Sequence, residues 1–166
     1  MKKVFVLFMT VALVGLASAA FAASTATATQ DVNITIPEST AIATTGTGSL
    51  TLVVPAAGTD FSPVTDNTNC TYDVSTNVGS GAAKKITAAI TTGGNMPANT
   101  TLTATLVAPT QGTANSNVTL STVAADMVTG VYKTLSSGLV VSYTLGATYL
   151  ADPFSGTKTI TYTITP

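Results

Sequence analysis

The stretch from Gly156 to Pro166, G-T-K-T-I-T-Y-T-I-T-P, constrains the fold of this chain most. In an extended conformation Ile160, Tyr162 and Ile164 point to one face and the intervening threonines to the other, because side chains alternate along a strand. β-Branched and aromatic residues in strict alternation are typical of a strand with one buried face. The sequence therefore predicts a C-terminal strand whose apolar side needs a second sheet to cover it, with Ile160, Tyr162 and Ile164 in the core.

The same alternation recurs along the chain. Further strands are predicted, with turn-forming Gly, Pro, Asn and Asp between them, at residues 31–36, 48–55, 71–76, 84–92, 100–107, 117–121 and 138–145. Residues 38–47 form a linker or a weak additional strand, and residues 56–69 a long surface loop. Residues 122–131 are ambiguous, because their apolar side chains recur at the spacing of a short helical turn or crossover.

No strong helical pattern separates any two of these strands, which favours antiparallel pairing over a parallel sheet. The sequence therefore predicts an all-β fold, an immunoglobulin-like antiparallel β-sandwich of about eight strands. A closed antiparallel barrel is the alternative architecture.

The first residues have the features of a secretory signal peptide. Two lysines, Lys2 and Lys3, precede an apolar run, and Ala20-Phe21-Ala22 matches a small-x-small cleavage site. A membrane anchor fits less well, because the apolar run is too short for a comfortable span. We expect a signal peptide at residues 1–22 and one domain at residues 23–166, of which residues 23–30 form a flexible N-terminal stretch. The product is expected in the periplasm, at the cell surface or outside the cell, with no transmembrane segment after cleavage.

Charged residues make up only 8% of the chain, against about 25% in typical proteins. Without Lys2 and Lys3 the net charge is 4 − 7 = −3, and there is no arginine. Nucleic-acid binding depends on clustered basic residues, so a nucleic-acid partner is not expected. The one remaining basic doublet, Lys84-Lys85, is interpreted as a solvated strand start or as protection of a sheet edge.

The sequence contains few residues that could carry chemistry. Histidine, the commonest general base and metal ligand, is absent, and no nucleophile, phosphate-binding or zinc motif occurs. We therefore expect no catalytic residues, no cofactor and no metal. The loop carboxylates Asp60 and Asp66, with Asn67 and Asn69, could supply oxygen ligands to calcium. Their spacing does not match an EF-hand, and Asp and Asn are also good turn formers.

One cysteine, Cys70, rules out an intramolecular disulfide, so the domain must depend on its core. A small buried hydrophobe is the favoured interpretation of Cys70. A surface thiol that pairs between chains is the alternative. The tyrosines mostly occupy inward strand positions, which favours core over a carbohydrate-binding platform.

The C-terminal region also resembles a known family. The loop A-T-Y-L-A-D-P-F-S-G-T and the threonine-alternating strand that follows it resemble exported bacterial surface subunits of the fimbrial and spore-coat-U type. The resemblance covers mainly residues 139–166 and the predicted N-terminal strand. It implies an immunoglobulin-like sandwich and a structural role. Subunits of the chaperone-assembled class commonly carry a disulfide near the start, whereas Cys70 stands alone here.

Two functions are consistent with these features. The first is a non-catalytic structural or assembly subunit of the bacterial surface, such as a pilus, coat or matrix component. Its partners would be copies of itself or other surface proteins. The second is a secreted or periplasmic adhesion module that binds a glycan or a protein.

Val32, Ile34 and Ile36 are the candidate interface for strand addition to a neighbour, because three alternating apolar residues are followed directly by Pro37. The same segment would otherwise pair within its own domain as an ordinary first strand.

Overall fold

The computed structural model describes residues 26–166, so the predicted signal peptide at residues 1–22 lies outside the described residues. Residues Ile36–Pro166 form one compact unit. Its elements are β1 (Thr40–Thr45), β2 (Val64–Asp66), β3 (Thr71–Thr76), the 3-10 turn η1 (Ser80–Ala82), β4 (Lys84–Thr92), β5 (Thr100–Leu106), β6 (Thr113–Ala114), β7 (Val118–Thr119), β8 (Ala125–Val131), β9 (Thr134–Ala147) and β10 (Thr159–Thr165).

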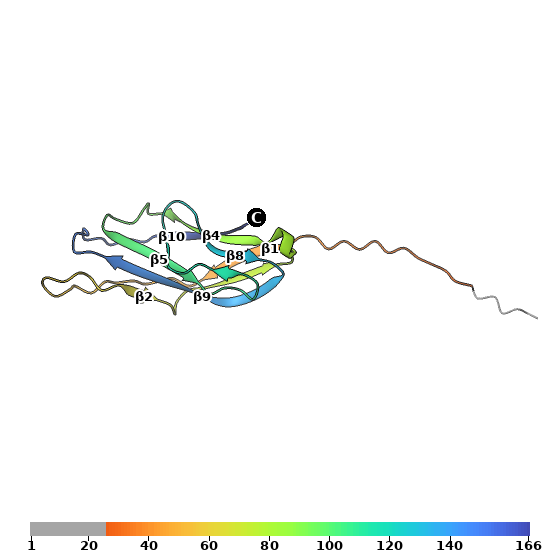
Figure 1. Ribbon diagram of the computed structural model, residues 1–166, viewed down its shortest axis with the longest axis horizontal. Helices are drawn as coiled ribbons and strands as arrows, with labels where there is room; N and C mark the ends of the chain where they lie inside the picture. Colours follow the sequence, from red (N-terminus) through yellow and green to blue (C-terminus); the bar gives the residue numbers. More distant parts are fainter. Residues whose placement is uncertain (1–25) are drawn as a thin grey trace, which may run out of the picture. The chain divides into compact units, whose positions relative to one another are not determined.

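The strands form two antiparallel sheets (Figure 1). The larger sheet has the order β1-β3-β9-β5-β7, with β2 also paired to β9, and the smaller has the order β10-β4-β8-β6. The predicted all-β antiparallel sandwich is therefore confirmed, with ten strands among residues 26–166 in place of about eight.

The core lies between the inward faces of the two sheets. In β4 the alternation buries Ile86, Ala88 and Ile90 completely or almost completely. Tyr72 and Val74 of β3 face them from the other sheet within one apolar cluster. Thr replaces charged residues on the outward faces, where its branched Cβ suits an extended backbone.

The ambiguous residues 122–131 contain a strand, β8, and no helical turn. Consecutive residues Met127 and Val128 are both fully buried, which an undisturbed strand would not allow. The β4–β8 register shifts on either side of Ile86, the mark of a β-bulge, and this irregularity brings both side chains inward. The bulge therefore explains why the apolar spacing imitated a helix.

The N-terminal third is where sequence-based strand assignment was wrong. Residues 71–76 and 84–92 form strands with the predicted bounds. The strands predicted at residues 31–36 and 48–55, however, are not formed. The weak candidate at residues 38–47 contains β1 instead, and the loop at 56–69 contains β2. Alternation shows that a segment can form a strand, whereas a strand also needs a neighbour with which to pair.

Candidate functional site

The longest outer strands of the two sheets lie on the same side of the sandwich. β10 ends the smaller sheet and β1 ends the larger one, and the two come close to each other. On the opposite side the outer strands, β6 and β7, have only two residues each. Outer strands present unpaired backbone N–H and C=O groups, so the greatest length of available sheet edge lies along β1 and β10. We call this the open side.

The edge of β10 lacks the usual protection against strand addition. Proteins commonly shield outer strands with charged residues, proline or a bulge within the strand. The seven residues of β10, T-I-T-Y-T-I-T, include neither charge nor proline. The register irregularity with β4 lies at the first residue, Thr159, and leaves the strand regular from Ile160 onward. β10 therefore offers a regular and uncharged edge.

Side chains of the open side are only partly buried. Ile160, Tyr162 and Ile164 of β10 pack against the core but remain partly exposed, as does Ile42 of β1. Their partners in β4, such as Ile86 opposite Ile164, are fully buried. The difference follows from position, because a side chain in an outer strand has a neighbouring strand on one side only. An added strand with inward apolar side chains would complete their burial.

A tyrosine pair joins the two sheets at the open side. The hydroxyls of Tyr143 in β9 and Tyr162 in β10 are hydrogen-bonded at 2.8 Å. Burial raises the pKa of Tyr162, with Tyr143 adding to the effect, and burial likewise raises the pKa of Tyr143. Both hydroxyls thus remain protonated. The pair fixes the position of β10 on the larger sheet without a charge.

Cys70 lies beside this pair and is buried. A Cβ placed on Gly48 would lie 3.3 Å from the Tyr143 ring and 3.6 Å from the Cys70 Sγ, so the backbone at residue 48 covers both. Burial raises the pKa of the Cys70 thiol. These observations agree with the interpretation of Cys70 as a small buried hydrophobe.

Asp66 holds the segment after β1 in place. Its carboxylate accepts hydrogen bonds from the Ser49 N–H at 2.9 Å and from the Asn69 side-chain amide at 2.9 and 3.0 Å. The Thr68 N–H donates at 3.2 Å. These hydrogen bonds stabilise the ionised carboxylate and lower the pKa of Asp66 to about 2. The bond from the Asn69 side chain has the largest effect.

Both aspartates among the possible calcium ligands accept hydrogen bonds within the protein. The Asp66 carboxylate accepts from Ser49, Thr68 and Asn69. The Asp60 Oδ1 accepts a hydrogen bond from the Tyr149 N–H at 2.8 Å. Across residues 26–166, no three His, Cys, Asp or Glu side chains gather into an arrangement that could hold a metal ion.

The predicted strand-addition residues lie in extended chain. Val32 and Ile34 are 73% and 80% exposed, and Ile36, at the start of the compact unit, is 81% exposed. Within the described part of the chain, residues 26–39 belong to no strand. The segment therefore keeps its alternating pattern with its apolar side chains in solvent.

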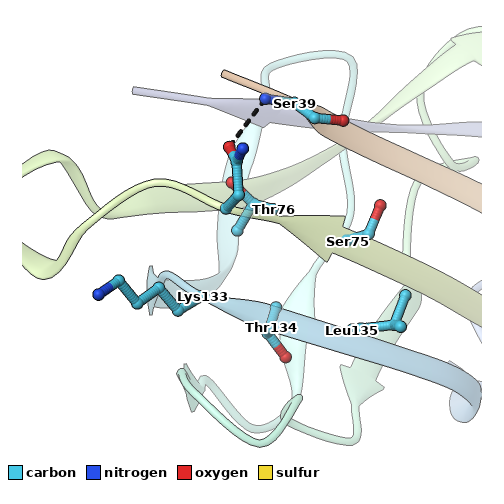
Figure 2. Close-up of a pocket in the computed structure, with 7 residues that line it drawn as sticks. Ser39, Ser75, Thr76, Lys133, Thr134 and Leu135 are labelled. Atoms are coloured by element: carbon cyan, nitrogen blue, oxygen red, sulfur yellow. Dashed lines mark hydrogen bonds between the residues drawn. The ribbon is translucent and has the colours of Figure 1, made fainter. Parts of the chain in front are cut away.

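Both residues of the basic doublet are ion-paired. The Lys84 Nζ lies 2.9 Å from the Glu38 Oε1, and the Lys85 Nζ lies 3.1 Å from the Asp126 Oδ1. A shallow, open depression lies nearby, over the adjacent ends of β3 and β9 (Figure 2). Its lining residues are Ser39, Ser75, Thr76, Asn77, Lys133, Thr134 and Leu135. Its lining thus consists of four hydroxyl side chains, one amide, one lysine and one leucine.

The opposite end of the sandwich carries exposed apolar loop residues. Tyr149, Leu150 and Phe154 are all more than half exposed. The loop is held by the Asp60–Tyr149 bond and by the Asn99 side-chain amide, which donates to the Leu150 carbonyl at 3.1 Å. Tyr72 and Tyr162, in contrast, belong to the core or pack against it. Tyr149 is thus the tyrosine best placed for external contacts.

Sequence reasoning missed Asp66, Asn77 and Glu38 as structural determinants. Asp66 lies in D-N-T-N, a pattern typical of Asx turns, and Asn77 directly follows a strand. These local signals mark side chains that bond to backbone, although they do not identify which distant segment is held.

Comparison with known proteins did not add a family. No protein-family model matched the chain, and neither the curated proteins nor the solved structures contained a match. Among residues 26–166, no helix has the length and apolar character required to cross a membrane.

Proposed function

We propose that this protein is a non-catalytic, exported structural subunit of the bacterial cell surface that assembles by β-strand addition. One observation carries the proposal: the same chain has a long unprotected outer strand and an extended segment with alternating exposed apolar residues. We call residues 26–36 the arm. In strand addition, backbone hydrogen bonds provide affinity and alternate side chains fill the apolar positions.

The open side supplies the apolar positions. Ile160, Tyr162 and Ile164 alternate along β10 with the same period as Val32, Ile34 and Ile36 along the arm. Removing these exposed side chains from water would contribute about 25 cal/mol for each Å² of apolar surface buried. The proposal therefore accounts both for the incomplete burial at β10 and for the exposure of the arm.

The absence of charge in β10 also supports this function. An unguarded edge is an aggregation hazard in a protein that acts alone. The same edge is an advantage in a subunit that must accept a strand from a neighbouring copy. Export belongs to the proposal through the signal-like residues 1–22, and N-terminal sequencing of the exported protein should begin at Ala23.

Replacement of the arm's apolar face tests the assembly. Val32→Asn/Ile34→Asn/Ile36→Asn should give a monomer in size-exclusion chromatography and no polymers in negative-stain microscopy. The matched control Thr29→Asn/Thr35→Asn changes the other face of the arm and should assemble like the wild type. Circular dichroism should show the same sheet content in all three proteins. Equal assembly by the triple variant would contradict the proposal.

Adhesion is the second candidate, and the exposed residues Tyr149, Leu150 and Phe154 favour it. If the domain binds a glycan or a protein through these loops, the triple arm variant should bind as a monomer. Tyr149→Ala/Phe154→Ala should then lose that binding in a glycan-array or cell-surface assay. Binding that depends on the arm and not on these loops would exclude the loop-mediated form of adhesion.

A further inference from the structure

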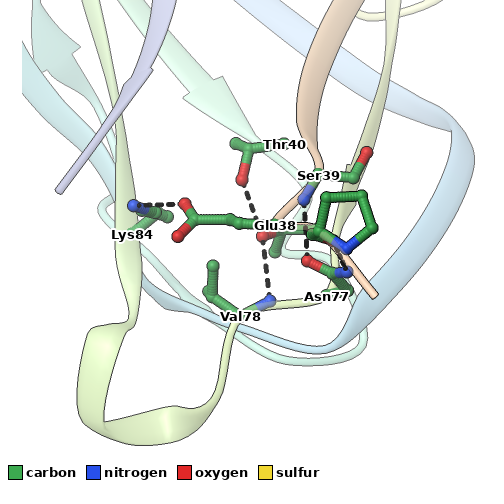
Figure 3. A network of polar contacts seen from close by, with 8 residues as sticks. Glu38, Ser39, Thr40, Asn77, Val78 and Lys84 are labelled. Carbon is green, nitrogen blue, oxygen red and sulfur yellow. Dashed lines mark hydrogen bonds and ion pairs between the residues drawn. The ribbon is translucent and has the colours of Figure 1, made fainter. Parts of the chain in front are cut away.

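A hydrogen-bond cluster holds the chain where the arm joins β1 (Figure 3). The Ser39 N–H donates to the Asn77 Oδ1 at 2.8 Å, and the Asn77 side-chain Nδ2–H donates to the Pro37 carbonyl at 2.8 Å. The Asn77 backbone N–H donates to the Ser39 carbonyl at 3.2 Å. Asn77 therefore bonds to residues 37–39 through both its backbone and its side chain.

These bonds extend the line of β1 beyond its first residue. β1 and β3 pair with Thr40 opposite Thr76, so Ser39 opposite Asn77 is the next position of the same antiparallel ladder. The Asn77 side-chain amide continues the hydrogen bonding beyond that position, to the Pro37 carbonyl. Residues 37–39 thus run straight on from β1 and do not turn.

An ion pair ties the same segment to the other sheet. The Lys84 Nζ lies 2.9 Å from the Glu38 Oε1, and the Lys84 side chain is only 13% exposed. Lys84 begins β4, whereas Asn77 follows β3. Residues 37–39 are therefore fastened to both layers of the sandwich. We call Asn77, Glu38 and Lys84 the clasp.

The clasp lies at the end of the sandwich where β10 finishes. Thr165 of β10 is opposite Lys85 of β4, one residue beyond the clasp residue Lys84, and Figure 1 shows the C-terminus at this end. β10 runs toward this end and β1 runs away from it. To lie beside its own β10, the arm would have to reverse direction at residues 37–39, where the clasp holds the chain straight.

We propose that the clasp prevents the arm from adding to its own β10 and so commits it to the β10 edge of a second copy. This inference rests on the proposed function. A tethered segment has an effective concentration in about the millimolar range for a short connection, so pairing within one chain would normally win at lower protein concentrations. A structural barrier to that pairing is therefore required for polymers to form.

Hydrogen exchange of the arm amides, measured across a range of protein concentrations, tests the clasp. In the wild type, protection of the Ile34 amide should rise with concentration, together with multimer formation. In Asn77→Ala, protection should appear in the monomer and become independent of concentration. The ratio of arm-protected monomer to multimer should rise about five- to thirtyfold, as expected for the loss of one to two net hydrogen bonds. Glu38→Gln, at a largely exposed side chain, should act in the same direction without risk to the core.

Asn115→Ala is the matched control, because the Asn115 side-chain amide also donates to a backbone carbonyl, that of Asp126, at 2.9 Å. It should behave like the wild type. If Asn77→Ala and Glu38→Gln keep concentration-dependent protection equal to that of the wild type, the clasp does not direct the arm, and strand addition still stands. If the wild-type arm amides exchange freely at every concentration, strand addition itself is wrong, and the role of the clasp with it.

Discussion

Paired truncations at Ile164 and Ile86 test whether the open side is incomplete in the single subunit. The two residues face each other across β10 and β4, and they differ in that Ile86 is fully buried while Ile164 is only partly buried. Ile86→Ala should leave a closed cavity and cost about 2–5 kcal/mol of unfolding free energy. Ile164→Ala should cost about 1–2 kcal/mol, because full burial of such a side chain is worth about 1.5–3 kcal/mol and part of that gain is missing.

The measurement is urea denaturation followed by circular dichroism. The Val32→Asn/Ile34→Asn/Ile36→Asn background keeps the protein monomeric under the proposed function. In a thermal melt of the same variants, each kcal/mol should lower the melting temperature by about 4 °C in a domain of this size. In assembled protein with the natural arm, the cost of Ile164→Ala should rise toward that of Ile86→Ala, because the added strand completes the burial of Ile164.

Two results would refute this reasoning. Equal costs for Ile164→Ala and Ile86→Ala in the monomer would mean that β10 is already covered on its outer side. No effect of Ile164→Ala in either state would mean that the apolar face of β10 makes no contribution to the core.

Three further predictions concern the domain itself. The folded-state pKa of Asp66 is lowered from 3.8 to about 2, so its contribution to stability is present above about pH 4 and lost as the pH falls toward 2. When unfolding free energy is measured against pH, Asp66→Asn should lack this loss of stability between about pH 4 and 2. Gly46→Ala should strongly destabilise the domain, because a Cβ there would lie 1.7 Å from the Asn69 carbonyl oxygen. Gly58→Ala should cost less, because Gly58 also has a positive φ but open space around it, and thermal melts of the two variants measure the difference. The far-ultraviolet spectrum should be that of a β-sheet protein and unchanged by reductant, since Cys70 is the one cysteine; a change on reduction would reveal a disulfide between chains.

Local sequence patterns were sufficient to predict β3 and β4, which are inner strands of the two sheets. In residues 71–76 and 84–92 inward apolar residues alternate with polar or small ones, and each segment lies between turn-forming glycines or asparagines. β3 and β4 each have a neighbouring strand on both sides. The fold therefore gives these segments the strand conformation that their residues prefer. The C-terminal strand followed from the same reasoning.

The open side depended on tertiary structure. Residues 40–45 and 48–55 both suit a strand, and the second has the stronger pattern, yet only the first lies where β3 provides a neighbour. Pairing of β1 with β3 and of β10 with β4 joins residues far apart in sequence, and local periodicity carries no information about such partners. The sequence could therefore predict the alternation of β10, but not that β10 would be an outer strand.

The clasp likewise has parts that local sequence indicates and an arrangement that only tertiary structure produces. An asparagine after a strand indicates a side chain that bonds to backbone, and Glu38 and Lys84 are two of the few charged residues in the chain. Only the packing of β1 against β3, and of β3 over β4, brings these three residues to one point. Composition and alternation are local properties, so the sequence was sufficient to predict a threonine-rich β-sandwich with few charges and an N-terminal segment with one apolar face. The open edge and the hold on the arm were decided by tertiary structure, because both depend on which distant strands are neighbours.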